Sequence, residues 1–417
     1  MFTFRPPESS FPLVPGCHFK IPDQPIGSLQ ISFRYIISIA MKMKGAKYSK
    51  KLFAFLDILG FEPIVNESRK NPQLISRIAE MLSRSEQIAR ESLKFRPTVL
   101  KVNPNDYAYR SFSDTSAIYG PYNSHDDLSF ISAWIMMYQY LMWKEEQTFI
   151  RGAVVYGDLY SDENVLFGPA LIDAYHLEQC KTKAMWPRVL IDQSVLANTN
   201  EAERRRDFYE FLRQDDDNLA YLDYLRELFH VITLAENKRT IGKRQYDFGL
   251  PASFFEEHKQ AILKQYDSVK EDDKDGSKIG KYVKLSEYHN STIDRLRQVI
   301  KGLMNNGNLI SGLFDDLKAS ESAQKAGLQY QPKYSVEEHP EQADMLNILG
   351  TVINRLFINP PPDILKTPGI VVIGQTGKVE GSKAIHTLSR EVLKALTTLD
   401  RALQDATIDI NSLSLKV

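Results

Sequence analysis

Between residues 51 and 191, short apolar runs alternate with segments that carry helix-like spacing. The first run, 51–58 (KLFAFLDI), is nearly continuous in apolar residues and ends just before Gly60, which predicts a buried strand. The order along this stretch is strand, helix, two strands, helix, strand, helix, strand. Such an order predicts an α+β fold built on a split βαβ sheet that is partly antiparallel, with its helices on one face.

The remaining elements are predicted from spacing and turn chemistry. Apolar residues recur every three to four positions over 73–93, which indicates an amphipathic helix. Residues 98–102 and 107–119 are expected to form an antiparallel hairpin with its turn at 103–106, a turn-forming Asn-Pro-Asn-Asp cluster. The later elements are expected as a helix from 126 to about 147, a strand at 149–156, a helix at 169–178 and a strand at 187–191.

The composition places the chain among ordinary folded proteins. Of its 417 residues, 43% are hydrophobic and 25% are charged, far from the signature of disorder. The 52 Lys and Arg nearly balance the 53 Asp and Glu, so no general attraction to nucleic acid or to anionic lipid is expected. Cys17 and Cys180 are the only cysteines, which argues against a disulfide framework and favours the cytoplasm. The apolar stretch 29–41 contains Arg34 and is too short to span a bilayer, so no membrane association is expected.

Three parts are expected along the chain. Residues 1–47 are interpreted as an N-terminal appendage, or as an over-extended reading frame whose natural start is Met41 or Met43, because the composition changes abruptly there. Residues 48–235 hold the alternating elements. Residues 236–417 are expected to be mainly helical, with helices at 251–266, 285–317 and 382–406.

Two acids stand where a sheet could bring them together. Asp57 comes at the end of the first strand, and Asp114 lies within the expected hairpin. Carboxylate oxygens from neighbouring strands suit Mg²⁺ or Mn²⁺, and a pair of such ions can clamp a triphosphate. On spacing alone, a turn or strand-end cap is the simpler interpretation of either residue.

The surrounding motifs resemble those of class III nucleotidyl cyclases. Asp57-Ile58-x-Gly60-Phe61 is similar to the DIxGF metal motif of that family, and Ser113-Asp114 to its Gly-Asp hairpin. The segment 151–157 (RGAVVYG) resembles the RxGxxxG strand, and 168–178 (GPALIDAYHLE) resembles the following helix. The resemblance covers residues 48 to 235. It implies a ferredoxin-like cyclase domain with two Mn²⁺ or Mg²⁺ ions held by Asp57, Asp114 and the carbonyl of Ile58.

The departures from the family pattern concern the substrate. Where ATP-using cyclases carry an acid and a lysine that read adenine, this sequence has Val165 and Arg110. The ribose-binding Asn and the phosphate-binding Arg of the family's helix align with Ile172 and His176. Recognition of a purine base is therefore expected to be lost. The several N–H donors of the Arg110 guanidinium suit the acceptor-rich edge of a pyrimidine.

These substitutions resemble the pyrimidine cyclases of the bacterial Pycsar anti-phage systems. The resemblance implies that UTP, or alternatively CTP, is converted into the 3′,5′-cyclic nucleotide (cUMP or cCMP) and diphosphate, and that the product activates a separate cyclic-nucleotide-binding effector. It also implies a head-to-tail homodimer with residues from both chains in one site. Arg151, Lys181 and Lys183 are candidates for stabilising the leaving group, and Arg151 is counted as catalytic.

Other interpretations stay open. One alternative is a domain that has lost catalysis and binds a nucleotide or a partner, and another is a cyclase for ATP or GTP. Arg151 is also compatible with a structural ion pair to Asp173, and His176 with simple packing. His258 and His289 are expected to be isolated, and no zinc spacing is present. The acidic run 215–217 is expected to be a solvated turn.

Overall fold

The computed structural model describes residues 47–93, 100–179, 186–234, 238–241, 244–247, 251–271, 273, 276–305, 344–345, 348, 352, 370–371, 378–379 and 382–413. The chain divides into two compact units, Met1–Tyr48 and Ser49–Val417. Every helix and strand named below belongs to the second unit. Lys181 and Lys183 lie outside the described residues.

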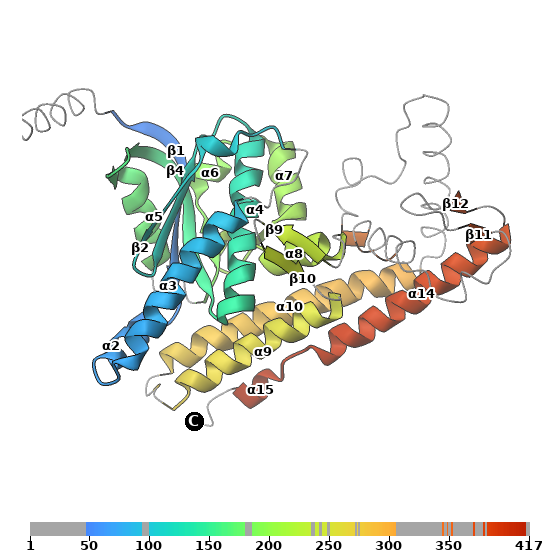
Figure 1. The fold of residues 1–417 in the computed structure, drawn as a ribbon. Coiled ribbons are helices and arrows are strands. Elements are labelled where there is room, and N and C mark those ends of the chain that lie inside the picture. The colour runs from blue at the N-terminus through green and yellow to red at the C-terminus, as the bar shows by residue number, and fades with distance from the viewer. Residues whose placement is uncertain are drawn as a thin grey trace, which may run out of the picture. The chain divides into compact units, whose positions relative to one another are not determined.

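A mixed sheet forms the centre of this unit (Figure 1). Its strands run in the order β2-β3-β1-β4-β6-β8-β7, and β5 pairs with β4 beside this path. β4 and β6 are parallel, whereas the other neighbours are antiparallel. The fold is therefore α+β, as predicted. The strands are β1 (Ser49–Ile58), β2 (Ala108–Phe112), β3 (Thr115–Gly120), β4 (Ile150–Ser161), β5 (Leu166–Phe167), β6 (Val189–Ile191), β7 (Leu212–Gln214) and β8 (Ala220–Leu222).

Helices cover both faces of the sheet, so the prediction of helices on one face is wrong. Leu56 of β1 lies opposite Ser116 of β3, whose hydroxyl is 3.4 Å from that of Tyr138 on α4. Phe55, the residue before Leu56 on β1, points to the opposite face of the sheet. There its ring contacts the ring of Tyr175 on α5, with the centroids 5.7 Å apart. Figure 1 shows α3 and α4 on one side of the central strands and α5 on the other. The helices are α2 (Phe61–Ser68), α3 (Gln73–Ser92), α4 (His125–Leu141), α5 (Pro169–Gln179), α6 (Gln193–Leu196), α7 (Glu201–Glu210) and α8 (Tyr224–Leu234).

The expected hairpin has its turn in a different place. Asn103 accepts a hydrogen bond from the backbone N–H of Asn105 and begins a short 3-10 helix, Pro104–Asp106, instead of reversing a strand. The reversal falls at Ser113 and Asp114, between β2 and β3, with Ser113 in the left-handed region at φ 58°. The Asn-Pro-Asn-Asp cluster at 103–106 therefore forms a helical turn instead of a hairpin turn, because Asn and Pro also favour helix starts.

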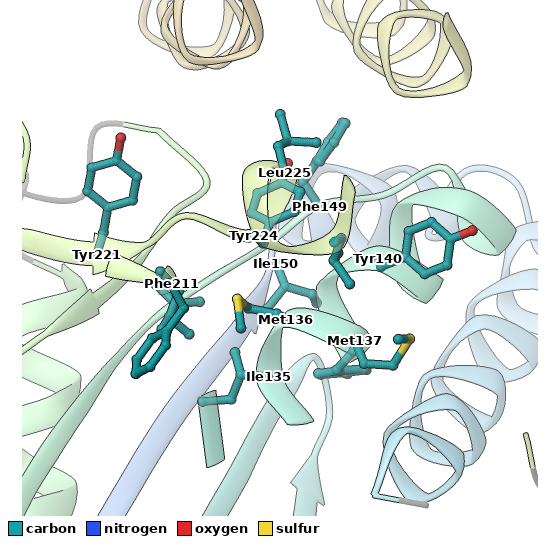
Figure 2. Packing of buried hydrophobic residues seen from close by; sticks show 14 of the residues in the cluster. Ile135, Met136, Met137, Tyr140, Phe149, Ile150, Phe211, Tyr221, Tyr224 and Leu225 are labelled. Carbon is teal, nitrogen blue, oxygen red and sulfur yellow. The ribbon is translucent and has the colours of Figure 1, made fainter. Parts of the chain in front are cut away.

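Within the region around the sheet, residues 49–234, which we call the sheet domain, α4 is a long helix that is almost wholly buried. α4 begins with a capping box between Ser124 and Asp127, and a π-helical turn, Met142–Glu146, follows its last residue. The indole N–H of Trp134 donates to the carbonyl of Ala89 on α3 at 2.7 Å. In Figure 2, Met136 of α4 lies close to Ile150 at the start of β4. The Met and aromatic residues of this segment are therefore core packing, since most of them are buried.

The helices after residue 250 pack beneath the sheet domain and share its core. They are α9 (Pro251–Val269), α10 (Ser277–Asn305), α14 (Ser382–Asp405) and α15 (Ile410–Leu413), and α9, α10 and α14 run side by side (Figure 1). Phe254 of α9 contacts Tyr140 and Trp143, so one hydrophobic cluster joins both regions. Two short hairpins complete the described elements: β9 (Lys238–Ile241) with β10 (Arg244–Asp247), and β11 (Ile370–Val371) with β12 (Lys378–Val379).

His258 and His289 are not isolated, contrary to the expectation from sequence. Both are fully buried, their rings stack at 5.1 Å, and their Nδ1 atoms are 3.0 Å apart. The other nitrogen of His258 is 2.7 Å from the hydroxyl of Tyr224, and that of His289 is 2.9 Å from the carbonyl oxygen of Ala406. The pair therefore connects α8, α9 and α10 with the end of α14. Burial lowers the pKa of both rings, that of His289 to about 4.

Candidate active site

Asp57 stands near the end of β1, between two partner strands. It lies opposite Thr115 of β3 and Arg151 of β4 in the sheet register. Because side chains alternate along a strand, Asp57 is on the same face as Phe55, the face covered by α5. After Ile58 the chain turns at Gly60, which has φ 80° and so adopts a conformation that glycine favours. The turn fixes where β1 stops and where its last carboxylate is presented.

Asp114 reaches the same place from the hairpin. Its carbonyl oxygen accepts a hydrogen bond from the backbone N–H of Ile58 at 3.2 Å, so the hairpin turn is fastened to the end of β1. Asp114 is half-buried. The structure thus brings together Asp57, Ile58 and Asp114, the three residues expected to hold metal ions.

The Asp114 carboxyl lies near enough to Asp57 to affect the pKa of Asp57. Burial raises the pKa of Asp57 above its ordinary value, and Arg151 acts against this shift. The Asp114 carboxyl raises the pKa of Asp57 further, both through its charge and by hydrogen bonding to the protonated form. A negative charge on Asp114 therefore disfavours ionisation of Asp57, and a cation between the two carboxyl groups would relieve this effect.

Arg151 is held between two acids. Its Nε and Nη2 donate to the same oxygen of Asp57, Oδ2, at 3.0 and 2.9 Å. Its Nε also lies 2.8 Å from Oε1 of Glu178 on α5, near enough for an ion pair but not aligned as a hydrogen bond. The alternative pairing with Asp173 is wrong, since Asp173 is exposed and Arg151 pairs with Asp57 and Glu178. Gly152 permits this close approach of β4 to β1, because a Cβ there would meet the carbonyl oxygen of Phe55 at 2.2 Å.

Glu178 of α5 also belongs to the site, through its ion pair with Arg151. Its side chain is fully buried, and this burial raises its pKa to about 7. Arg151 opposes the shift and the charge of Asp57 adds to it. A signal for its position exists in the sequence: Ala170, Ala174 and Glu178 are four apart and form the buried side of α5.

Lys281 enters the site from α10, more than a hundred residues beyond Arg151. The side chain is half-buried, and burial lowers its pKa. The charge of Arg151 lowers that pKa further, whereas the nearby acids Asp57 and Glu178 act in the opposite direction. No local pattern could have predicted this residue, because only the packing of α10 against the sheet domain brings it here.

The four residues expected to bind substrate are not gathered around the carboxyl pair. Arg110 of β2 donates to the carbonyl oxygen of Asp162 and lines an open cavity of about 710 Å³ at the edge of the sheet. From the strand spacing and the register, its backbone is about 12 Å from that of Asp57. Val165, Ile172 and His176 are exposed, the first two by 46% and 54%. Within one chain, Val165, Ile172 and His176 therefore lie on the protein surface and do not line the site around Asp57 and Asp114.

The donor set fits ions that arrive with a phosphate ligand. Among the described residues, no group of three or more His, Cys, Asp or Glu converges on one point. Mg²⁺ commonly takes only one or two carboxylates and completes its shell with water and substrate phosphates. Asp57 and Asp114 meet that requirement, and their mutual repulsion would be relieved by a bound cation.

Comparison with known proteins adds no identification: no family model matches the sequence, and no curated protein matches it. Over the described part of the chain, no helix has both the length and the apolar character needed to cross a membrane.

Proposed function

We propose that the chain is a pyrimidine nucleotide cyclase that converts UTP, or alternatively CTP, into the 3′,5′-cyclic nucleotide and diphosphate. The observation that carries this proposal is the meeting of Asp57 and Asp114 at one end of neighbouring strands, where Asp57 lies opposite Thr115 and the backbone N–H of Ile58 donates to the carbonyl of Asp114 at 3.2 Å. The arrangement around them supports it. The strands β2-β3-β1-β4, joined through α3 and α4, have the connectivity expected of a ferredoxin-like cyclase domain.

The roles of the residues follow from their positions. Asp57, Asp114 and the carbonyl of Ile58 would hold Mg²⁺ or Mn²⁺. When bound, such ions acidify a ribose hydroxyl and neutralise charge on a triphosphate. Arg151 orients Asp57 by engaging Oδ2 twice, which leaves Oδ1 for other partners. In the reaction the 3′-oxygen forms a bond to the α-phosphorus, the bond to the diphosphate breaks, and the hydroxyl proton passes to water.

A homodimer is part of this proposal. Exposed large apolar residues gather on β5 and α5, where single exposed residues would be ordinary but a group indicates an interface. They are Val165, Phe167, Ile172 and Tyr175. In the proposed head-to-tail dimer, Arg110 of one chain enters the site of the other and reads the pyrimidine edge.

The biological role proposed is defence against phage. In this role the cyclic nucleotide is a second messenger made in the cytoplasm, and it activates a separate effector that harms the infected cell. The sequence motifs that resemble Pycsar cyclases support this assignment.

One observation favours a second function. Arg151 already satisfies one oxygen of Asp57, so this carboxylate also fits a structural ion pair in a catalytically inactive domain that binds a nucleotide or partner. A purine cyclase is the third possibility, and the substitutions at Arg110 and Val165 argue against it.

The test is turnover by the purified full chain with UTP, CTP, ATP and GTP, each with MnCl₂ or MgCl₂, and products identified by mass spectrometry. We expect cUMP or cCMP, and losses of at least about a hundredfold in Asp57→Asn and Asp114→Asn. Asp294→Asn, at an exposed position on α10, is the matched control. A cyclic purine product would refute the base assignment, and absence of any product would leave the inactive binding domain.

A further inference from the structure

The site has fewer available positive charges than its expected substrate requires. A nucleoside triphosphate bears several negative charges, and its departing diphosphate needs compensation from the protein as well as from metal ions. Arg151 is engaged by Asp57 and Glu178 and lies between them. Its charge is therefore largely used in balancing the protein's own acids.

Lys281 is a cation in a different situation. Among the residues that the structure describes, it forms no ion pair within 4 Å, although Asp57 and Glu178 are near enough to affect its pKa. It is half-buried, so part of its side chain keeps access to solvent. A lysine ammonium is a compact charge on a flexible stem, which suits contact with phosphate oxygens.

The position of Lys281 is fixed by contacts on both sides of it in the sequence. Before it, the carboxylate of Asp273 accepts from the backbone N–H of Ile279 at 2.6 Å and holds the first turn of α10. After it, Tyr282 is buried, and its hydroxyl would lie 3.9 Å from a Cβ at Gly60. Gly60 belongs to the turn that follows Asp57. The start of α10 is thus seated against the same turn that ends the metal-binding strand.

We propose that Lys281 binds the β- and γ-phosphates of the substrate and the diphosphate product, so that a helix outside the expected cyclase segment completes the active site. This inference rests on the proposed function for the identity of the substrate, but not for the phosphate contact itself. Lys281 of α10 then supplies the positive charge for the leaving diphosphate, the role for which Lys181 and Lys183 were candidates.

The test measures binding of inorganic diphosphate with MnCl₂ by titration calorimetry, using the full chain. We expect Lys281→Met to weaken binding by tenfold or more and Lys281→Arg to restore most of it. Lys284→Met is the control, because Lys284 is exposed on the same helix and pairs with Glu287 at 2.7 Å. Circular dichroism and the thermal midpoint check that each variant is folded.

The outcomes separate this inference from the cyclase proposal. If Lys281→Met binds diphosphate within twofold of the wild type, or if the wild type binds none, the phosphate contact is refuted. If the wild type binds diphosphate through Lys281 but cyclises no nucleotide, the contact stands and the cyclase proposal falls. With an active enzyme, Lys281→Met should also raise KM for the triphosphate, while Lys284→Met leaves it unchanged.

Discussion

The buried histidine pair makes the stability of the chain depend on pH in a way that can be calculated. The carbonyl of Ala406 only accepts hydrogen bonds, so His289 must carry its proton on Nε2. If His289 is neutral, its Nδ1 is an acceptor, and His258 must donate from its own Nδ1. His258 Nε2 then accepts from Tyr224. All three contacts are satisfied with both rings neutral, and an added proton would place two N–H groups face to face.

The size of the effect follows from the pKa of His289. It is about 4 in the folded chain against 6.5 for an unperturbed ring. A lowered histidine pKa means that the unfolded chain binds protons first, so stability is complete above pH 6.5 and declines as the pH falls toward 4. The expected loss between pH 7.5 and 4 is about 3 kcal/mol from His289. The pKa of His258 is lowered as well, so its contribution has the same sign.

Glu178 makes the unfolding free energy depend on pH with the opposite sign, so its contribution must be separated from that of His289. Its pKa is raised to about 7, so its contribution to stability is present below pH 4.5 and is lost as the pH rises through 7. The wild-type profile alone can therefore look nearly flat. The quantity to measure is the difference in unfolding free energy between the wild type and His289→Gln at each pH.

The assay is urea denaturation between pH 4 and 7.5, followed by tryptophan fluorescence, since the ring of Trp143 contacts that of His258 at 4.9 Å. The stability advantage of the wild type over His289→Gln should shrink by about 3 kcal/mol on acidification. A constant difference across this range would refute the reasoning. If the variant does not fold, NMR titration of the wild-type imidazoles provides the same test, because titration of the His289 ring near pH 6.5 would contradict its buried neutral state.

Three further predictions concern the site. Glu178→Gln should gain about 3 kcal/mol relative to the wild type between pH 4.5 and 8 in urea denaturation, because the amide does not ionise; a pH-independent difference would contradict the assigned pKa. Asp114→Asn should stabilise the metal-free chain by up to about 1 kcal/mol, by removing repulsion with Asp57, and should abolish its thermal stabilisation by MnCl₂; unchanged stabilisation would exclude Asp114 as a ligand. Gly60→Ala should cost about 1–2 kcal/mol through its left-handed backbone, measured as a lower urea midpoint, and a neutral result would show that the turn can relax.

Much of the sheet domain could be predicted from the sequence because its elements have strong local patterns. The strand at 51–58, the helices at 73–93 and 169–178 and the aromatic helix from 126 are confirmed as β1, α3, α5 and α4, with shifts at their ends. β7 and β8 were missed because each has only three residues, too few to show a period.

Features that depend on distant contacts could not be predicted. The acidic run 215–217 forms a largely exposed turn between β7 and β8, as expected, but its pairing with Arg188 was not predicted: Asp215 and Asp217 both form ion pairs with this buried residue from just before β6. The position of Lys281 near the site and the pairing of His258 with His289 depend on the packing of α9 and α10 against the sheet domain, which no local pattern encodes. For the carboxyl pair, the sequence motif indicated Asp57 and Asp114, but their relation to Arg151 and Glu178 required the register of β4 and the placement of α5.

The helix α10 spans 29 residues, which corresponds to a rod of about 44 Å. Its first turns carry Lys281, its middle carries His289, and farther on Arg297 pairs with Asp400 of α14 at 2.9 Å. One end of α10 lies against the turn at Gly60, and the other is paired with α14. A displacement of the C-terminal helices would therefore also move the residues beside Asp57 and Asp114. A partner bound to the C-terminal helices would then act on Asp57 and Asp114 from a distance, without contacting them.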